Sequence, residues 1–357
     1  MGGRRSARWA LGCLSGYFGL CGVALGQVSV LTIAEGETGV QRSERVALTQ
    51  LGSFEREALS VGRDLAFGDE LTSAAAGIAV VLLCSETEGD AEITLSSPFR
   101  VVLMPTTSGR GCALNLPAGT ADVLAGTDTE IHAGEVTLGS ERTRYGISVR
   151  RAAGNVEDDV YVFDGAVRVV RRKLAPVRLT AGKRMALKGA APARMVKLHQ
   201  KDFTRAARVY AKVDASRTQL TGEALQRSFR RLEAVHTNVL REPDNAEPRV
   251  QLAVARMNLN VKTPSTLHYL TQAQTLNKGD TALLANTAMI KGMVFQSLGD
   301  EEMAKKEYRA AKAIDPAVTR EEVGQVHKIN PLFLQRIQPP TIERLAPGRY
   351  EAITPNR

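Results

Sequence analysis

The spacing of apolar residues changes near residue 190, and this change constrains the fold more than any other feature of the chain. Before it, short runs rich in Val, Ile and Leu alternate with polar residues and are separated by Gly, Pro, Asp or Ser. That pattern is typical of β-strands. After it, apolar residues recur three or four positions apart in runs that stop at Pro, Gly or Asn, as in amphipathic helices. The 357 residues therefore predict a multidomain chain, with an all-β domain followed by an all-α domain.

The β region is predicted to form a sandwich, a jelly-roll-type module or a coiled sheet. Its strand-like runs are GIAVVLL, AEITL, FRVVLM, CALNL, GEVTL, YGISV, VYVF, AVRVV and VRLTA. Between VYVF and AVRVV stands Asp164-Gly165, which predicts a tight β-hairpin because both residues tolerate positive φ. The residues expected to face each other across this hairpin are Val160, Val162 and Phe163 with Val167, Val169 and Val170.

Residues 1–26 have the layout of a signal peptide. A basic start with Arg4-Arg5 precedes an apolar run from Trp9 to Leu25, and small residues stand before Gln27. The run is short of the roughly 20 apolar residues that span a bilayer. We therefore expect cleavage near Gly26 and export to the periplasm or cell envelope; the alternative is a retained membrane anchor.

Composition and charge argue against a nucleic-acid partner. Aromatic residues make up only 5% of the chain, which leaves little for stacking on bases. The formal net charge is +9, and loss of Arg4, Arg5 and Arg8 with the signal peptide would lower it to +6. An exported chain with a mild positive charge is not expected to bind nucleic acid.

Two cysteines lie outside the predicted signal peptide, and they are a candidate disulfide. Cys84 and Cys112 both stand near strand ends in the β region. Cysteines often pair in an oxidising compartment. Two buried thiols remain the alternative.

The sequence contains none of the short motifs that carry common chemistry. The zinc-protease motif, the nucleophile elbow and the phosphate-binding P-loop are all absent, and the five histidines are scattered singly. We therefore expect no enzymatic activity, no catalytic residue, no metal and no cofactor.

The helical half resembles tetratricopeptide (TPR) repeats. Its clearest repeat, residues 285–318, has the family's residue types at Gly292, Phe295, Gly299, Ala304, Tyr308, Ala311 and Pro316. A weaker copy lies 38 residues earlier, with Val254, Met257, Leu270 and Ala273 at the matching positions. We expect TPR-like helices over residues 203–325, a flexible linker at 188–202 and an extended, Pro-containing tail at 326–357.

The TPR resemblance implies a partner-binding face on the first helix of each pair. The candidate partner-binding residues there are Asn286, Met289, Met293, Gln296, Gln251 and Asn258. Methionine and amide side chains suit adaptable peptide contacts. The alternative is that the methionines belong to the core.

The β half resembles the FecR domain, an extracytoplasmic β module, over residues 59–187, with residues 27–58 as a lead-in. Fragments in that family's order include GDELTS at 68–73, TRYGI at 143–147, FDGAVRV at 163–169 and LTAGK at 179–183. Well-known members also carry a cytoplasmic anti-sigma segment and a membrane helix. This chain has the predicted signal peptide in their place, so the transmembrane relay is not carried over.

Together these features predict a non-enzymatic exported bacterial protein that acts as an interaction or scaffold module in the periplasm or envelope. The alternative is an extracytoplasmic sensor of FecR type that relays a receptor or ligand signal through a separate membrane partner. A basic cluster is either a solvated helix face or a contact with an anionic envelope surface. Its members are Arg205, Arg208, Lys212, Arg227, Arg230 and Arg231.

Overall fold

The structure is a computed structural model. It describes residues 27–35, 45–53, 55–86, 89–106, 111–125, 128–140, 143–152, 155–171, 174–188, 193–261, 264–277 and 279–337. The predicted signal peptide and the last twenty residues of the predicted tail, 338–357, lie outside these ranges. Within them, no helix combines the length and the apolar character needed to cross a bilayer.

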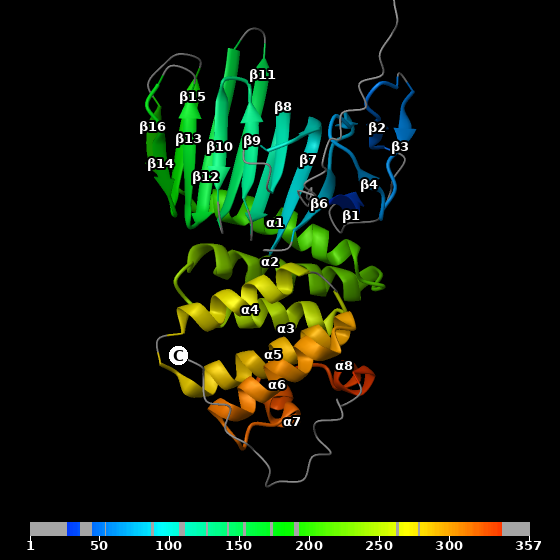
Figure 1. The fold of residues 1–357 in the computed structure, drawn as a ribbon, viewed down its shortest axis with the longest axis vertical. Helices are drawn as coiled ribbons and strands as arrows, with labels where there is room; N and C mark the ends of the chain where they lie inside the picture. The colour runs from blue at the N-terminus through cyan, green and yellow to red at the C-terminus, as the bar shows by residue number, and fades with distance from the viewer. Residues whose placement is uncertain are drawn as a thin grey trace, which may run out of the picture.

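Strands come first and helices second, and the two regions lie end to end (Figure 1). The strands are β1 (Gln27–Glu35), β2 (Ala47–Thr49), β3 (Glu57–Ala58), β4 (Asp64–Leu65), β5 (Glu70–Ser73), β6 (Ile78–Glu86), β7 (Gly89–Met104), β8 (Cys112–Ala125), β9 (Thr129–Ala133), β10 (Val136–Ser140), β11 (Arg144–Ala152), β12 (Asn155–Asp164), β13 (Ala166–Arg171), β14 (Val177–Thr180), β15 (Lys183–Lys188) and β16 (Arg194–Lys197). The helices are α1 (Gln200–Ser216), α2 (Gly222–Arg241), α3 (Glu247–Asn258), α4 (Pro264–Leu276), α5 (Thr281–Leu298), α6 (Glu301–Ile314), α7 (Arg320–Val326) and α8 (Pro331–Arg336).

The strands form one hydrogen-bonded sheet that is folded on itself into two layers. Two long strands belong to both layers: residues 89–96 of β7 pair with β6, and residues 99–102 pair with β5. In β8, residues 112–115 pair with β9 and residues 119–124 pair with β11. The first layer therefore contains β3, β2, β5, β9, β10, β13 and β14, and the second contains β4, β1, β6, β11, β12, β15 and β16.

The bend that separates the layers lies at a proline and a glycine. The Ser97-Pro98 peptide is cis, and the β7–β8 register shifts between Ser96 and Arg100. Opposite this point stands Gly119, with φ of 120°. A Cβ on Gly119 would lie 2.6 Å from the Cβ of Phe99, so only glycine permits this approach.

The hydrophobic core lies between the two layers. Alternate residues of the second layer point into it, among them Val80, Leu82 and Cys84 of β6. Cys84 forms a disulfide with Cys112 of β8, with the Cα atoms 6.2 Å apart. Because Cys112 lies in the half of β8 that pairs with β9, the disulfide connects the two layers.

The predicted hairpin at Asp164-Gly165 is wrong. β12 pairs with β11 and β15, whereas β13 pairs with β10 and β14, so the chain crosses from one layer to the other at Gly165. At the next turn, Ala181-Gly182, the chain crosses back from β14 in the first layer to β15 in the second. The two turns lie next to each other, since the Ala181 amide donates to the Gly165 carbonyl at 2.9 Å. A positive-φ glycine favours any tight reversal, but it does not decide whether the flanking strands pair or pack across a core.

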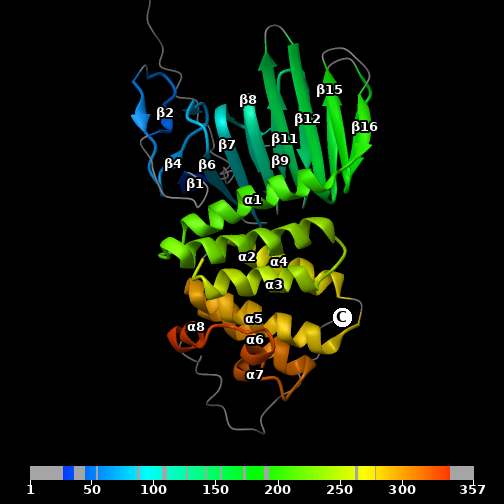
Figure 2. The same ribbon diagram turned by 180° about the vertical axis from the view of Figure 1, so that it is seen from behind.

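Helix α1 covers one end of the outer face of the second layer (Figure 2). Tyr161 and Phe163 of β12 pack there against Ala207 of α1, while Val81 of β6 packs against Val213. This explains why VYVF and GIAVVLL are almost continuously apolar, because these strands are buried on both faces.

The remaining helices stack below α1 (Figure 1). Gly292 of α5 lies against Tyr308 of α6, where an added Cβ would come within 2.8 Å of the ring. Lys291, next to Gly292, forms an ion pair with Glu307 at 2.9 Å. Residues at the repeat positions Gly292 and Tyr308 therefore contact each other between α5 and α6.

Three predicted boundaries need correction. The lead-in 27–58 is part of the sandwich, because Val30, Ile33 and Leu48 are buried in its core. The predicted linker 188–202 contains β16, which pairs with β15, and the first residues of α1. The predicted tail contains α8, whose Phe333 is buried against the helices. In each case, apolar residues too few to show a clear period still find a partner in the folded chain.

The disulfide predicts a measurable dependence of stability on reductant. Cys84 and Cys112 are 28 residues apart, and a loop of that size is expected to contribute about 3.5 kcal/mol to the free energy of unfolding. Urea unfolding of the wild type should therefore shift to lower denaturant in reductant. The double variant Cys84→Ala/Cys112→Ala should unfold at the same urea concentration with or without reductant. If reductant also left the unfolding midpoint of the wild type unchanged, the expectation would be contradicted.

Candidate binding site

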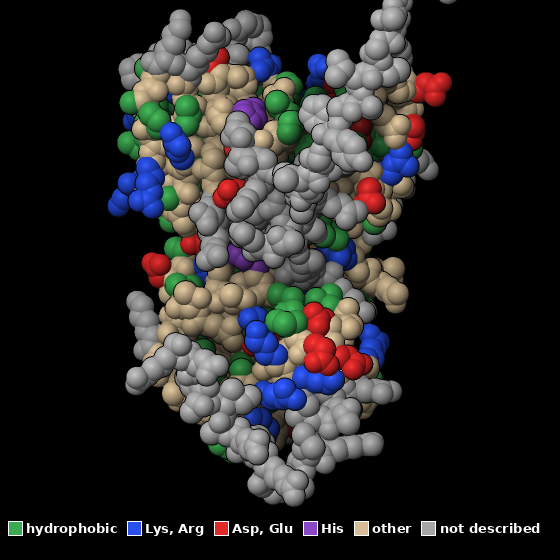
Figure 3. Space-filling model, in the orientation of Figure 1, with side chains coloured by type: hydrophobic (Ala, Val, Ile, Leu, Met, Phe, Trp, Pro, Cys, Tyr) green, Lys and Arg blue, Asp and Glu red, His purple; other side chains and the backbone are tan. Residues whose placement is uncertain are grey.

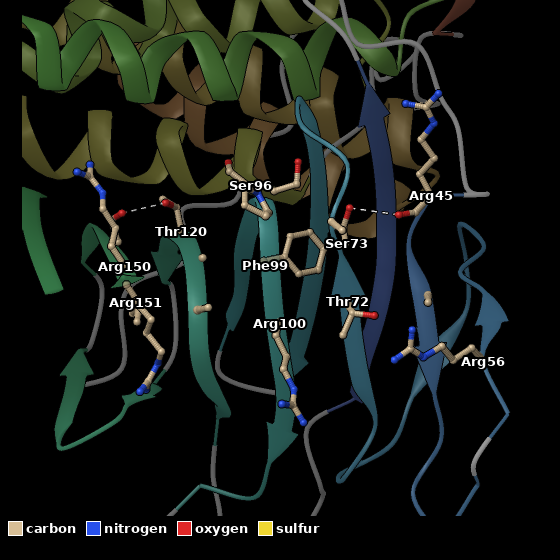
Figure 4. A pocket seen from close by; sticks show the side chains of 18 of the residues that line it. Arg45, Arg56, Thr72, Ser73, Ser96, Phe99, Arg100, Thr120, Arg150 and Arg151 are labelled. Atoms are coloured by element: carbon tan, nitrogen blue, oxygen red, sulfur yellow. Dashed lines mark hydrogen bonds between the residues drawn. The ribbon is translucent and has the colours of Figure 1, made fainter. Parts of the chain in front are cut away.

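A hollow lined by arginines lies where β7 and β8 bend from one layer to the other (Figure 4). Its volume is about 790 Å³. Strands from both layers line it, and α1 contributes Arg205. The hollow is therefore built by the same bend that creates the two layers of the sandwich.

Six arginines from different parts of the chain line the hollow. They are Arg45, Arg56, Arg100, Arg150, Arg151 and Arg205. Arg150 and Arg151 of β11 lie on one side, and Arg45 and Arg56 lie on the other (Figure 4). The hollow thus collects positive charges that are up to 160 positions apart in the sequence.

Only part of this charge is neutralised. Glu70 accepts two hydrogen bonds from Arg100, at 3.0 and 2.9 Å, and Glu35 pairs with Arg45 at 2.8 Å. Arg56 and Arg150 form no ion pair with any acidic side chain in the described ranges. Both are exposed, so their guanidinium groups are available to a ligand.

Between the arginines, the lining is made of hydroxyl-bearing and small residues. Thr120 donates to Ser148 at 3.2 Å, and Ser73 donates to the Arg45 carbonyl at 3.2 Å. Phe99 lies in the middle but is only 4% exposed. The other small residues of the lining are Ala47, Thr72, Ala74, Ser96, Ser97, Ala118 and Gly119. The described lining has no His, Cys, Asp or Glu, and its arginines and hydroxyl groups can donate hydrogen bonds to negative groups.

A buried carboxylate, that of Asp122, interacts with Arg205 of the hollow. Asp122 of β8 is 6% exposed and faces away from the core, toward α1. Burial raises the pKa of Asp122 to about 6, although the charges of Arg205 and Arg144 act in the opposite direction. Gly146 on the neighbouring β11 makes room for it, since a Cβ there would lie 2.6 Å from Oδ1 of Asp122.

Arg144 of β11 connects the sandwich to the helices. Its guanidinium lies 3.9 Å from the ring centre of Tyr210 on α1 and 5.4 Å from that of Tyr269 on α4. Burial would lower the pKa of Arg144, but Tyr269, Tyr210 and Asp122 together raise it. The cation is therefore held between two aromatic rings at the boundary of the two regions.

A second buried group of charges ties α1, α2 and α3 together. The Asp214 carboxylate lies 2.8 Å from both Nε2 of His236 and Nε of Arg256, and all three side chains are almost fully buried. Burial would raise the pKa of Asp214, but Arg256 and His236 outweigh it and hold the pKa well below its usual range. Burial lowers the pKa of His236 to about 4, so the neutral ring donates its Nε2 proton to Asp214 at neutral pH.

Asp164, at the crossing between the layers, makes a further link to the helices. Its carboxylate accepts a hydrogen bond at 2.9 Å from Arg249 of α3, which is almost completely buried. Gln272 of α4 donates to the same oxygen at 3.3 Å. The FDG fragment therefore anchors the helical region to the sandwich.

The predicted partner-binding face of the helices is largely occupied. Met289 and Met293 are 2% and 0% exposed and belong to the core, so they cannot contact a partner without repacking. Asn258 donates to the Lys328 carbonyl and accepts from the Asn330 amide, which fixes the start of α8. Gln296 accepts from the Tyr308 hydroxyl, Asn286 is half-buried, and Gln251 is exposed.

The predicted basic cluster does not form one surface. Arg205 lines the hollow, Arg208 pairs with Glu233, and Lys212 donates to the Gly77 carbonyl. Arg227 pairs with Glu223 on exposed α2, where Arg230 and Arg231 are also exposed. On the face shown in Figure 3, positive and negative side chains lie side by side over the helical region. Contact between these helices and an anionic envelope surface stays a prediction.

Sequence reasoning did not find the hollow. Apart from the adjacent pair Arg150-Arg151 after YGISV and Arg205 of the predicted basic cluster, its arginines are isolated in the sequence, and the bend that gathers them depends on strand pairing across the whole domain. Within the described ranges, no group of His, Cys, Asp or Glu side chains is arranged to hold a metal ion.

The buried Asp214 network predicts a large effect of charge removal. Asp214→Asn leaves Arg256 buried without its counter-charge, and the expected loss is about 3–5 kcal/mol in the free energy of unfolding. The measurement is urea unfolding at neutral pH. Glu223→Gln, which breaks the exposed pair with Arg227, is the matched control and should leave stability unchanged. Equal effects of the two substitutions would contradict the role of the network.

His236 predicts a loss of stability in acid. Its pKa is about 4 in the folded chain against an ordinary value of 6.5, so between these pH values the unfolded chain binds a proton that the folded chain does not. This contribution is present above pH 6.5 and is lost as the pH falls to 4. The Asp122 carboxyl, whose pKa burial raises from an ordinary value of 3.8 to about 6, acts in the opposite direction between these two pH values. The difference between wild type and His236→Gln isolates the histidine: the wild type should lose more stability than the variant from pH 7 to 4.5, and parallel curves would refute this.

The comparisons with known proteins are weak. No protein-family model and no curated protein matches the chain. Among solved structures, two of "a putative anti-sigma factor" from Parabacteroides distasonis ATCC 8503 are similar to part of it. The sequence identities are 11% and 10%, the TM-scores are 0.31 and 0.32, and each match covers 39% of this chain. The chain spans 64% of the length of those structures, and a likeness at this level carries no functional argument.

Proposed function

We propose that the chain is a non-enzymatic binding protein of the bacterial cell envelope, in which a FecR-like sandwich and TPR-like helices form one interaction module. The observation that carries this proposal is the arginine-lined hollow, which offers hydrogen-bond donors and charge but no set of catalytic groups among its lining residues. The FecR-like order of the fragments GDELTS, TRYGI, FDGAVRV and LTAGK supports an extracytoplasmic setting.

The contacts between the two regions support a scaffold role. Arg144 between Tyr210 and Tyr269, and Arg249 on Asp164, are buried interactions that require defined geometry. Glu92 of β7 also accepts a hydrogen bond from the Ser265 amide of α4, at 3.3 Å. Such contacts favour one fixed orientation of the helices on the sandwich. A partner bound in the hollow would therefore be held at a fixed position relative to the helices.

A second candidate function is sensing, and one specific observation favours it. Arg205 lines the hollow and also interacts with Asp122, which in turn faces Arg144 at the boundary with the helices. A ligand that engages Arg205 would change the charge balance around these buried groups. This arrangement would let the sandwich pass ligand occupancy to the helices, from which a separate membrane partner could receive it.

A photo-crosslinking amino acid placed at three exposed positions tests the binding role in envelope preparations. Ala74 lies in the hollow, Gln251 lies on α3, and Arg178 lies on the outer face of the first layer. We expect one defined adduct from Ala74 that is lost in the Arg56→Glu/Arg150→Glu background, and no such adduct from Arg178. An adduct from Gln251 alone would move the binding surface to the helices, and the absence of a position-specific adduct would refute the proposal. For the sensing alternative, binding of the captured partner should change hydrogen exchange in α1; unchanged exchange would exclude it.

A further inference from the structure

We infer that the ligand of the hollow is an extended, acidic segment of another polypeptide; the inference rests on the proposed binding function and gives its partner a chemistry. Of the six lining arginines, Arg45 and Arg100 have carboxylate partners, whereas Arg56 and Arg150 have none among the described residues. Arg151 donates through Nε to the Pro117 carbonyl and also interacts with the Asp158 carboxylate. A ligand with several carboxylates complements this surplus, because arginine and carboxylate form charge-assisted, bidentate pairs.

The arginines are spread across the hollow. Arg150 and Arg151 lie on one side and Arg45 and Arg56 on the other, with Phe99, Arg100 and hydroxyl-bearing residues between them (Figure 4). A single phosphate is usually bound where several donors converge on one point, such as a glycine-rich turn before a helix. The arginines of the hollow do not converge in that way. Carboxylates at alternate residues of an extended chain are about 6–7 Å apart and reach separate arginines along a groove.

The lining between the arginines is made of small residues. Ala47, Ala74 and Ala118 carry only a methyl group, so a main chain can approach closely. Thr72, Ser96 and Ser97 carry hydroxyl groups, which both donate and accept hydrogen bonds and so match the amides and carbonyls of a peptide. The hollow therefore suits a polypeptide backbone as well as acidic side chains.

The hollow has few apolar anchors. Phe99 and Val149 are 4% and 3% exposed, and the described lining has no other aromatic residue and no Leu, Ile or Met, so Pro98 is its exposed apolar side chain larger than alanine. An amphipathic helix would need an apolar groove, and a lipid would need a surface for its acyl chains. Recognition in the hollow must then depend on charge and hydrogen bonds, which an acidic extended segment supplies.

Fluorescence anisotropy with the full chain tests the inference. The probe is a labelled twelve-residue peptide of alternating Glu and Ser, and its control is the same peptide with Gln for Glu. We expect the acidic peptide to bind at low ionic strength, to bind more weakly as salt is raised, and to bind far more tightly than the Gln peptide. Binding of both peptides with equal affinity would overturn the inference.

Matched charge variants separate the hollow from the overall positive charge of the chain. Arg56→Gln/Arg150→Gln removes two exposed charges from the hollow, and Arg168→Gln/Arg178→Gln removes two exposed charges from the outer face of the first layer. The hollow variant should lose at least tenfold in affinity for the acidic peptide, and the control variant less than twofold. Equal losses would show attraction to net charge alone and would overturn the inference. Unfolding curves of both variants confirm that each is folded.

Competitors distinguish the acidic polypeptide from other anions. Inorganic polyphosphate and phosphatidylglycerol vesicles are added to the complex with the labelled peptide. One of these anions could displace the labelled peptide at a lower concentration of anionic groups than an unlabelled acidic peptide needs. If that displacement also depended on Arg56 and Arg150, the ligand class would be that anion and not an acidic polypeptide. Adducts at Ala74 in envelope preparations without acidic-peptide binding would leave the proposed function standing and refute only the ligand class. Binding of the acidic peptide without any adduct at Ala74 would support the ligand class but refute the proposed function in the envelope.

Discussion

The bend of β7 and β8 is the constraint on which the rest of the structure depends. A single sheet becomes a two-layer sandwich because these strands change partners halfway along their length, at Ser97-Pro98 and Gly119. The bend lets the apolar sides of both layers face one core, and the Cys84–Cys112 disulfide connects the layers through it. It also turns the polar outer residues of both layers toward one hollow. The core and the candidate binding site are therefore two consequences of one change in strand direction.

The outer face of the second layer carries apolar side chains, and helix α1 buries them. Tyr161, Phe163 and Val81 face outward and would expose apolar surface without α1. Between these apolar contacts, Asp122 and Arg144 are buried as well, and their desolvation is offset by neighbouring charges and by the rings of Tyr210 and Tyr269. Removing one partner from such a set costs more than forming the set contributes. The charged groups thus specify how α1 sits on the sheet, while the apolar groups supply most of the attraction.

Sequence reasoning succeeded where a periodic pattern reports on nearby residues. The change from strands to helices follows from local spacing, and the structure has it. It failed where the outcome depends on distant partners. Asp164-Gly165 looks the same before a hairpin and before a crossing between layers, and Met289 and Met293 look the same in a groove and in a core. Arg45, Arg56 and Arg100 had no local signal, because the pairing of β2, β5, β7, β8 and β11 and the packing of α1 bring the arginines of the hollow together.

The position of Arg205 links the hollow to the boundary between the two regions. It comes from α1, and its guanidinium lies 4.8 Å from the ring centre of Tyr161 on the sheet. An anion that pairs with Arg205 would weaken its interaction with Asp122, and the carboxylate would then depend more on Arg144. Arg144 is the same cation that Tyr210 and Tyr269 hold between the sandwich and the helices. Binding in the hollow and docking of the helices therefore share charges, so an acidic ligand that stabilises one arrangement of Arg205 also biases the packing of α1.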